Sequence, residues 1–451
     1  MIQSINPATE KLLKEYQPYS NSNIQLIINK TSIDYLAWKK ITFNDRGLCF
    51  YAIADELEKD IDIHGKIISL EMGKPILESK TEILKCVCLI RYFAKHAENF
   101  LQSEEIKTEY SQSYIQYDPL GVIFGVMPWN FPYWQVFRFI VPAMMAGNTC
   151  IIKHASNVTG CSLLIEKLIK NNLSLKNAYN SLILDSSEVS NIIENKEIKA
   201  ISFTGSDYAG SQVAMNAGKS IKKVVLELGG SDPFIVLEDA DIGLAADAGV
   251  KARFLNAGQS CIAAKRFLVH EKIYDKFINK VEPIIKSLVI GNPLNKGTQI
   301  GPLAKYEFVE EIHSLVMSAI NDGAKCILGG EPLKGCYYSP TLLIDVTPNM
   351  RIFKEETFGP VFCITKISDS NEAVKFSNNS DYGLGGSIWT KNHRLAQNMA
   401  SEINTGAVFI NDMTKSDPRL PFGGIGKSGY GIELSKYGIR EFINMKTIVI
   451  K

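Results

Sequence analysis

Cys261 is the first residue in the chain whose setting suggests chemistry. It follows a turn-prone run, Asn-Ala-Gly-Gln-Ser, which itself follows a helical stretch. Most cysteines are small buried side chains, so an inert thiol is one interpretation. A thiol presented at a tight turn, however, faces a cleft, and its own backbone N–H is free to donate to an oxyanion. The turn therefore predicts a nucleophilic cysteine.

Glu227 interrupts an apolar run, Val-Val-Leu-Glu-Leu-Gly-Gly, that ends at Gly230. A carboxylate is costly to bury in apolar surroundings. One interpretation is a structural side chain bonded to the backbone, and the other is a general base whose pKa is raised by its surroundings. Gly229 and Gly230 allow the chain to turn and a ligand to approach closely. The residues alone leave both interpretations open.

Three further segments follow apolar runs. In Met-Pro-Trp-Asn-Phe-Pro, residues 127–132, the Asn130 amide could stabilise an oxyanion or could merely suit a turn. Phe-Thr-Gly-Ser, residues 203–206, could open a helix whose N-terminus favours phosphate, although this motif alone is weak. Lys153 ends a strand-like run and could hold a ribose hydroxyl or a phosphate, or it could be a solvated strand end.

These residues need a scaffold, and the apolar patterning predicts one. Residues 46–101 have apolar positions at helical spacing. The later apolar runs are nearly apolar on both faces, which is typical of parallel strands covered by helices on both sides. Such α/β sheets place ligands beyond the carboxyl ends of their strands. The expected strands are 121–127, 149–153, 200–204, 224–228, 233–237, 267–270 and 407–411.

Two segments do not fit that pattern. Residues 104–118 alternate Tyr, Ser, Gln and charged side chains, and residues 442–451 end in a strand-like sequence. They could pair with each other or across a subunit boundary, and an ordinary surface hairpin is the alternative.

Composition excludes several classes of protein. The 451 residues include 49 Lys and Arg against 48 Asp and Glu, so the charge balance favours neither nucleic acid nor an anionic membrane as a partner. No apolar run approaches the ~18 residues of a membrane-spanning helix. The N-terminus lacks the apolar core of an export signal, so we expect a cytoplasmic protein. The nine scattered cysteines do not form a disulfide framework, and the six histidines show no metal-binding spacing.

Seven motifs occur together in a recognisable order. They are MPWNFP, a lysine at the end of the next strand, FTGS, LELGG, GQSC, EETFGP and PFGGIGKSG. In this order, over essentially the whole chain, they resemble the NAD(P)-dependent aldehyde dehydrogenase superfamily. The stretches KHASNVTGC and LELGGSDPFIVL are similar to those of the bacterial succinate-semialdehyde dehydrogenases.

The resemblance implies an α/β fold of the aldehyde dehydrogenase type with three parts. These are a Rossmann-type cofactor domain, an α/β catalytic domain and a β oligomerisation arm. A return segment would close the substrate pocket, and the arm would build a homodimer or homotetramer. The implied ranges are 1–103 and 121–228 for the cofactor domain, 229–412 for the catalytic domain, 104–120 and 432–451 for the arm, and 413–431 for the return segment.

The resemblance also assigns catalytic roles. Cys261 would be the nucleophile, Glu227 the general base, and Asn130 with the backbone N–H of Cys261 the oxyanion hole. An aldehyde would be oxidised to a carboxylic acid through a thiohemiacetal and a thioester on Cys261, which Glu227-activated water would hydrolyse. Succinate semialdehyde is the expected substrate. The alternatives are another small aldehyde, or a non-catalytic protein that retains the fold.

NADP or NAD would be the cofactor. Strict NAD enzymes of the family often carry Glu at the position of Ser156, where it would repel a 2′-phosphate, so a neutral serine permits the use of both. The residues that match the family's cofactor contacts are Met127, Pro128, Trp129, Asn130, Lys153, Ser156, Gly205, Ser206, Leu228, Gly229, Glu356 and Phe358.

Arg138 matches the family's ligand for the substrate's remote carboxylate, since its fork can bond both oxygens; a surface ion pair is the alternative. Trp134 lies one helical turn earlier on the same face, and Ser416 lies in a loop that often closes the pocket. Two departures stand out. Leu255 replaces a second arginine, which predicts looser specificity, and Ala263 replaces a cysteine, which argues against a disulfide switch.

Three rival activities have less support in the sequence. Phosphorylating and CoA-acylating reductases of the same fold commonly lack the LELGG glutamate, so Glu227 counts against them. A thiol hydrolase would need a histidine placed to pair with Cys261, and the sequence indicates none.

Overall fold

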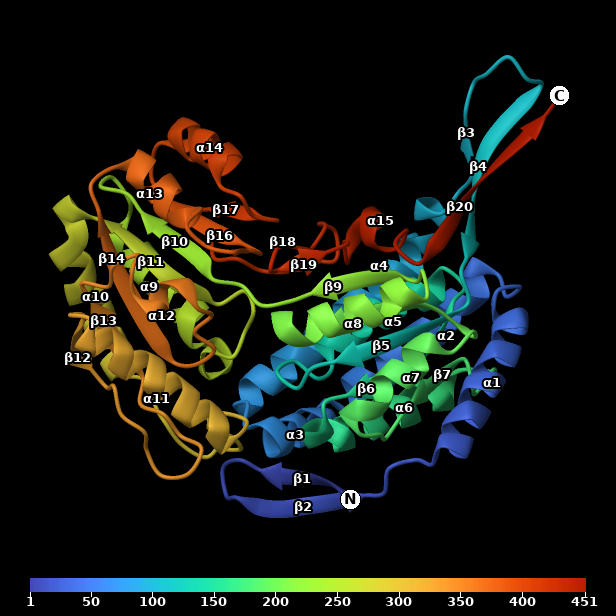
Figure 1. Cartoon of the computed structure of the whole chain (residues 1–451), viewed down its shortest axis with the longest axis horizontal. Coiled ribbons are helices and arrows are strands. Elements are labelled where there is room, and N and C mark those ends of the chain that lie inside the picture. The colour runs from blue at the N-terminus through green and yellow to red at the C-terminus, as the bar shows by residue number, and fades with distance from the viewer.

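The computed structural model describes residues 1–451 and shows two lobes side by side, with a β arm projecting from one of them (Figure 1). The chain crosses between the lobes immediately after Glu227, and it returns after residue 410. No helix has the length and apolar character needed to span a membrane.

The first lobe is built on a six-stranded sheet in the order β19-β9-β8-β5-β6-β7. All strands are parallel except β19, which pairs antiparallel with β9. The chain runs from β5 outward to β7 and then returns to the other side of β5, so the strand order reverses between β5 and β8. The strands are β5 (Val122–Met127), β6 (Thr149–His154), β7 (Tyr179–Ser181), β8 (Ile198–Thr204), β9 (Lys223–Glu227) and β19 (Gly429–Tyr430).

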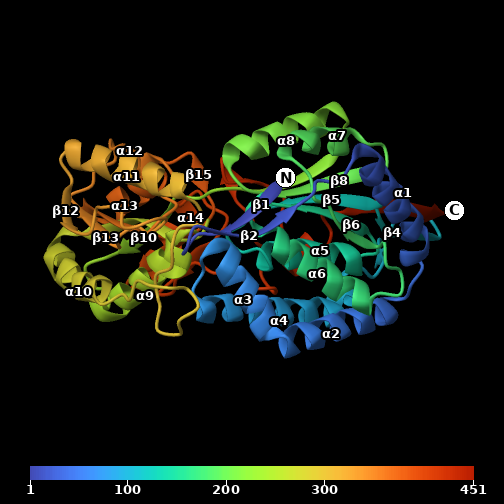
Figure 2. The same ribbon diagram turned by 90° about the horizontal axis from the view of Figure 1, so that it is seen from below.

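Helices cover both faces of this sheet (Figure 2). Alternate residues of one strand point to opposite faces; Ile123 joins the core beneath one helical layer, whereas Val122 and Phe124 join the core beneath the other. One layer contains α2 (Phe43–Lys59), α3 (Ile61–Met72), α4 (Ile76–Phe100), α5 (Trp134–Met145) and α6 (Thr159–Asn172), and the other contains α1 (Asn21–Trp38), α7 (Val189–Glu194) and α8 (Asp207–Lys219).

The second lobe has its own core and a seven-stranded sheet in the order β12-β13-β14-β11-β10-β16-β17, in which only β12 is antiparallel. Its strands are β10 (Asp232–Val236), β11 (Ala264–His270), β12 (Lys325–Leu328), β13 (Thr341–Ile344), β14 (Val361–Ile367), β16 (Gly386–Trp389) and β17 (Val408–Ile410). Its helices are α9 (Ile242–Phe254), α10 (Tyr274–Lys286), α11 (Tyr306–Asn321), α12 (Arg351–Lys354), α13 (Ser370–Ser377) and α14 (His393–Glu402).

The arm joins the two segments that did not fit the α/β pattern. Strand β4 (Gln112–Pro119) pairs antiparallel with β20 (Ile443–Ile450) along its full length, and β3 (Glu104–Glu105) pairs with the other edge of β4. The two segments therefore pair with each other within one chain. The remaining short elements are β1 (Ile2–Asn6), β2 (Lys11–Tyr16), β15 (Tyr382–Gly383), β18 (Ile425–Gly426) and α15 (Ser435–Gly438).

The predicted secondary structure agrees closely with these elements. All seven expected strands are strands, with ends shifted by a few residues at most, and residues 46–101 lie in helices α2 to α4 apart from short connections and Leu101. The predicted α/β class with helices on both faces of a parallel sheet is confirmed. The helical stretch expected before the cysteine turn is α9.

Candidate active site

Cys261 lies where two cavities meet. One cavity, of about 980 Å³, runs over the carboxyl ends of β5 and β8. The other, of about 660 Å³, lies between α4, α5, α9 and residues 413–416. Cys261 and Gln135 line both cavities. A thiol in this position can meet one ligand from each side.

A left-handed turn presents the cysteine. After α9 ends at Phe254, Asn256 and Ala257 each have φ of 53° and Gly258 has φ of 77°. A left-handed alanine costs about 1–2 kcal/mol. The turn is held from outside, because Glu78 accepts from the backbone N–H of Asn256 at 2.8 Å and Arg253 donates to the carbonyl of Gly258 at 3.0 Å. Such strain persists only where neighbours over-determine it, as they do at many functional sites.

The side chain of Asn130 lies against this turn. Its Nδ2 donates to the backbone carbonyl of Gln259 at 3.1 Å, and the backbone carbonyl of Asn130 accepts from Nδ2 of Asn256 at 3.0 Å. One N–H of the Asn130 amide and the backbone N–H of Cys261 donate no hydrogen bond within the protein. Two donors near the thiol are therefore unengaged, as an oxyanion hole requires.

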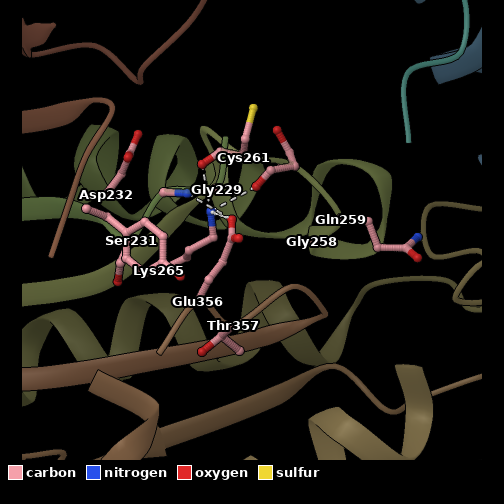
Figure 3. A network of polar contacts seen from close by, with 12 residues as sticks. Gly229, Ser231, Asp232, Gly258, Gln259, Cys261, Lys265, Glu356 and Thr357 are labelled. Carbon is pink, nitrogen blue, oxygen red and sulfur yellow. Dashed lines mark hydrogen bonds and ion pairs between the residues drawn. The ribbon is translucent and has the colours of Figure 1, made fainter. Parts of the chain in front are cut away.

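A buried lysine fixes the backbone of the nucleophile (Figure 3). Lys265 Nζ donates to the carbonyls of Ser260 at 3.0 Å and Cys261 at 2.7 Å. It also pairs with Glu356 at 3.0 Å, and Glu356 accepts from the backbone N–H of Gly230 at 3.0 Å. In Figure 3 the sulfur of Cys261 points away from these contacts. The network therefore holds the cysteine backbone and leaves the thiol outside it.

Glu227 is the last residue of β9 and is buried. Its Oε1 has no hydrogen-bond partner, and its Oε2 lies 4.0 Å from Nη2 of Arg138. Burial raises the pKa of the Glu227 carboxyl well above its ordinary value, and the positive charge of Arg138 opposes that rise. An unpartnered oxygen on a carboxyl of raised pKa is suited to accept a proton.

The Cys261 thiol is also affected by burial. Burial raises its pKa to about 11, against the opposing charges of Arg138 and Lys265. The side chain is half-buried rather than freely exposed to the cleft. Because only the thiolate is strongly nucleophilic, a base must take this proton before the sulfur can attack.

The larger cavity gathers the residues expected to contact a cofactor. All of them line it except Ser156, which lines an adjoining cavity of about 300 Å³ together with Lys153. The indole of Trp129 stacks on Phe308, with ring centres 5.1 Å apart, and meets the edge of Phe358 at 5.9 Å.

A dinucleotide suits this cavity in shape and in charge. The cavity lies where the strand order reverses, which is where open α/β sheets bind nucleotides. A Cβ at Gly229 would lie 2.2 Å from Oε2 of Glu356, so a larger residue there would displace the Glu356 carboxylate from its present place. Lys153 has no carboxylate within ion-pair distance, which leaves a cation available to a phosphate or a ribose.

The smaller cavity contains the three expected substrate residues, Trp134, Arg138 and Ser416. Arg138 is only 2% exposed, pairs through Nε with Glu433 and lies over the ring of Phe422 at 4.7 Å. The alternative of a surface ion pair is therefore wrong, because this pair is buried. Leu255 also lines the cavity, so the place of a second arginine is apolar.

Helix α4 supplies contacts that the sequence did not indicate. Glu78 holds the cysteine turn, Glu82 accepts from the backbone N–H groups of Tyr133 and Trp134 at 2.9 Å each, and Lys85 donates to Ser416 Oγ at 2.7 Å. Their spacing of four and three residues places them on one helix face. Helical periodicity was the only signal for them, and it does not distinguish them from other polar positions.

Comparison with known proteins agrees with this architecture. Residues 1–448 match the profile of the Aldehyde dehydrogenase family. The chain therefore belongs to the aldehyde dehydrogenase family. The predicted family and its fold are confirmed.

Several relatives share the whole length of the chain. A probable NADP(+) succinate-semialdehyde dehydrogenase of Synechocystis is 43% identical over 100% of this chain and 99% of its own. An NADP(+) succinate-semialdehyde dehydrogenase of Mycobacterium avium is 43% identical over 100% of this chain and 96% of its own. The crystal structure of succinic semialdehyde dehydrogenase from Streptococcus pyogenes with NADP+ superposes with a TM-score of 0.97, at 34% identity over 100% of both chains.

Proposed function

We propose that this enzyme oxidises succinate semialdehyde to succinate, with NADP as cofactor and NAD as a usable alternative. The observation that carries the proposal is the position of Cys261 between a cavity suited to a dinucleotide and a cavity that contains cationic side chains. The names of the full-length relatives support the same substrate and cofactor.

In the proposed reaction, the Cys261 thiol gives its proton to water in the cavity, and the resulting thiolate attacks the aldehyde carbon. The free N–H of Asn130 and the backbone N–H of Cys261 hold the oxyanion of the thiohemiacetal. As the oxyanion collapses to a carbonyl, the thiohemiacetal carbon would lose its hydride to the dinucleotide, which leaves a thioester on Cys261. Glu227 then takes a proton from water, the resulting hydroxide adds to the thioester carbonyl, and the C–S bond breaks to release the acid and restore the Cys261 thiol.

The cofactor would lie over the ends of β5 and β8. Trp129 and Phe358 would form an aromatic wall, Gly205 and Gly229 would permit close approach, and Glu356 would hold a ribose once it leaves Lys265. Ser156 and Lys153 line a small polar cavity that would take the 2′-phosphate of NADP, with the Lys153 ammonium opposing the charge of Asp185, which lines the same cavity.

We assign the two sheets to two tasks. Residues 1–103 and 121–228 would bind the cofactor, residues 229–412 would carry the nucleophile, and residues 413–431 would close the substrate cavity. The arm, 104–120 and 432–451, would join subunits into a homodimer or homotetramer, because both of its outer strands have unpaired edges that need covering.

A substrate panel tests the proposal. Succinate semialdehyde, butanal and propanal would each be supplied with NADP and with NAD, and formation of the reduced cofactor would be followed. A desolvated charge-assisted contact is worth about 1.5–3 kcal/mol, so kcat/KM should favour succinate semialdehyde over butanal by roughly ten- to a hundred-fold. Equal or better oxidation of butanal would overturn the substrate assignment, and Cys261→Ala should abolish oxidation with every aldehyde while retaining cofactor binding.

A further inference from the structure

Lys265 carries a buried charge next to the reactive cysteine, and it lines neither of the two cavities that meet there. It is the second residue of β11, and its side chain is only 1% exposed. Its ammonium donates to the backbone carbonyls of Ser260 and Cys261 and pairs with Oε1 of Glu356 (Figure 3). An ammonium has three donors, so these contacts use all of them. The only ion pair of Lys265 is with Glu356.

Glu356 is the member of this pair that faces the cofactor cavity. Its side chain is 18% exposed, and it lines the cavity over the ends of β5 and β8. Its Oε1 accepts from both Lys265 and the backbone N–H of Gly230, and its Oε2 accepts no hydrogen bond from the protein. A ribose hydroxyl in the cavity can therefore draw this carboxylate away from Lys265. The lysine itself stays on its two backbone carbonyls, because it does not line the cavity.

We propose that Lys265 is a positioning residue that couples the cofactor cavity to the reactive thiol. When the cofactor ribose engages Glu356, the carboxylate leaves Lys265, and the ammonium remains beside Cys261. Its positive charge is then no longer compensated by a paired anion, and it favours the Cys261 thiolate, whose proton passes to water. This inference rests on the proposed binding of NADP or NAD.

The charged groups around the thiol agree with this coupling. They are the cations Lys85, Arg138 and Lys265 and the carboxylates Glu227 and Glu356. Burial raises the pKa of the Cys261 thiol to about 11; the charge of Lys265 lowers this pKa, and the charge of Glu356 raises it. Among the five groups, only Glu356 lines the cofactor cavity. It is therefore the charge that a cofactor can move, and moving it leaves the effect of Lys265 on the thiol unopposed.

Asp232 is the other carboxylate near Lys265. It begins β10, is buried, and accepts from the backbone N–H of Gly385 at 3.1 Å. Burial raises the pKa of Asp232 to about 6, and the charge of Lys265 opposes that rise, although the two groups form no ion pair. Asp232 lines neither the cofactor cavity nor the substrate cavity, so it stays in place when Glu356 moves. The ammonium thus keeps an anion nearby, which limits the cost of leaving it buried and unpaired.

The rate at which iodoacetamide alkylates Cys261 measures this effect, because the thiolate is the nucleophile. The reagent can enter through the substrate cavity, and peptide mass spectrometry gives the rate for each cysteine. Cys88, which is exposed on α4, is the internal control. NADP and NADPH should each speed alkylation of Cys261 at pH 8 by about ten-fold, as a fall of about one unit in pKa would, and should leave Cys88 unchanged. NADPH has an uncharged ring, so an increase with it does not come from the charge of the oxidised ring.

Two variants isolate the ion pair. Lys265→Gln keeps N–H donors for the two carbonyls but has no charge, so it should bind the cofactor and show an acceleration below about two-fold. Glu356→Gln removes the compensating anion, so its Cys261 should react about ten-fold faster than that of the wild type without any cofactor. It tests the coupling by itself if the Lys265 variant fails to fold. Lys272→Met is the matched control, since Lys272 follows the same strand and pairs with Glu238 at the surface, and it should behave as the wild type.

Three results would each overturn the role of Lys265. They are an unchanged alkylation rate with NADPH in the wild type, a full acceleration in Lys265→Gln, and a cofactor-free rate in Glu356→Gln no higher than that of the wild type. Cofactor binding is followed separately by quenching of tryptophan fluorescence, since Trp129 lines the cavity. Absence of quenching in the wild type would refute the proposed cofactor and the coupling with it. A wrong substrate would appear only in the aldehyde panel, because alkylation needs no aldehyde.

Discussion

Replacing Glu227 by Gln tests the proposed division between acylation and hydrolysis. The amide retains the shape of the carboxyl but cannot accept a proton from water. Arg138 keeps its ion pair with Glu433 in this variant, so the substitution leaves no buried cation without a partner. We therefore expect a folded enzyme in which formation of the thioester is faster than its hydrolysis.

The size of the effect follows from the groups that could replace the base. General base catalysis typically contributes about 10²–10⁴-fold. Glu433 is engaged by Arg138, and Glu356 is held by Lys265 and the N–H of Gly230, so neither is free to substitute. We expect hydrolysis to slow by about 10³-fold, which corresponds to about 4 kcal/mol in the activation free energy.

Rapid mixing with excess NADP and succinate semialdehyde measures both steps. The variant should release a burst of about one NADPH per active site and then turn over at the slow rate, and trapped enzyme should carry the mass of one succinyl group on Cys261. An unchanged steady-state rate, or slowing of the burst and the steady state by the same factor, would show that Glu227 is not the hydrolytic base.

Three further predictions address other parts of the chain. Ser156→Glu should lower kcat/KM with NADP by about 10–100-fold and leave NAD little changed, since a carboxylate would repel the 2′-phosphate; equal loss with both cofactors would contradict this. The wild type should be oligomeric by light scattering, and Met445→Glu with Val449→Glu, on one exposed face of β20, should give monomers; an unchanged mass would contradict the arm's role. Burial raises the pKa of Glu78 to about 7, so folding stability should fall as pH rises from the ordinary Glu pKa toward 7, because the folded state retains a proton that the unfolded state has lost. Glu78→Gln should therefore gain about 1–3 kcal/mol over the wild type at pH 8 and less at pH 5, and a pH-independent Tm difference would contradict it.

Sequence patterning predicted the scaffold well because the controlling forces are local or periodic. Strands that are apolar on both faces indicate a covered parallel sheet, and turn residues after those strands indicate ligand sites. Both features appear at β5 and β8, where residues 127–130 and 205–206 line one cavity. Trp134 and Arg138, expected on one helix face, also line a common cavity.

Other features of the site could not be predicted because they depend on contacts between distant segments. The charge of Arg138 is compensated by Glu433. The backbone of Cys261 is held by Lys265, which is itself paired with Glu356. The sequence around Lys85 is that of an ordinary amphipathic helix, so nothing marks it as a cavity residue. The arm posed the same difficulty, since the sequences of β4 and β20 do not show whether the two strands pair within one chain, as they do in the structure, or across a subunit boundary.

Helix α4 explains why polar side chains occupy positions where a core would otherwise favour apolar ones. Glu78, Glu82 and Lys85 each hold a different wall of the substrate cavity: the cysteine turn, the start of α5 and the loop at Ser416. Each contact replaces water at a backbone or hydroxyl group that would otherwise be buried without a partner. Because the three walls come from distant parts of the chain, no apolar contact could fix their mutual distances as narrowly as hydrogen bonds of 2.7 to 2.9 Å do. A rotation of α4 would therefore shift the cysteine turn, the start of α5 and the loop at Ser416 together, so this one helix sets the positions of all three walls relative to one another.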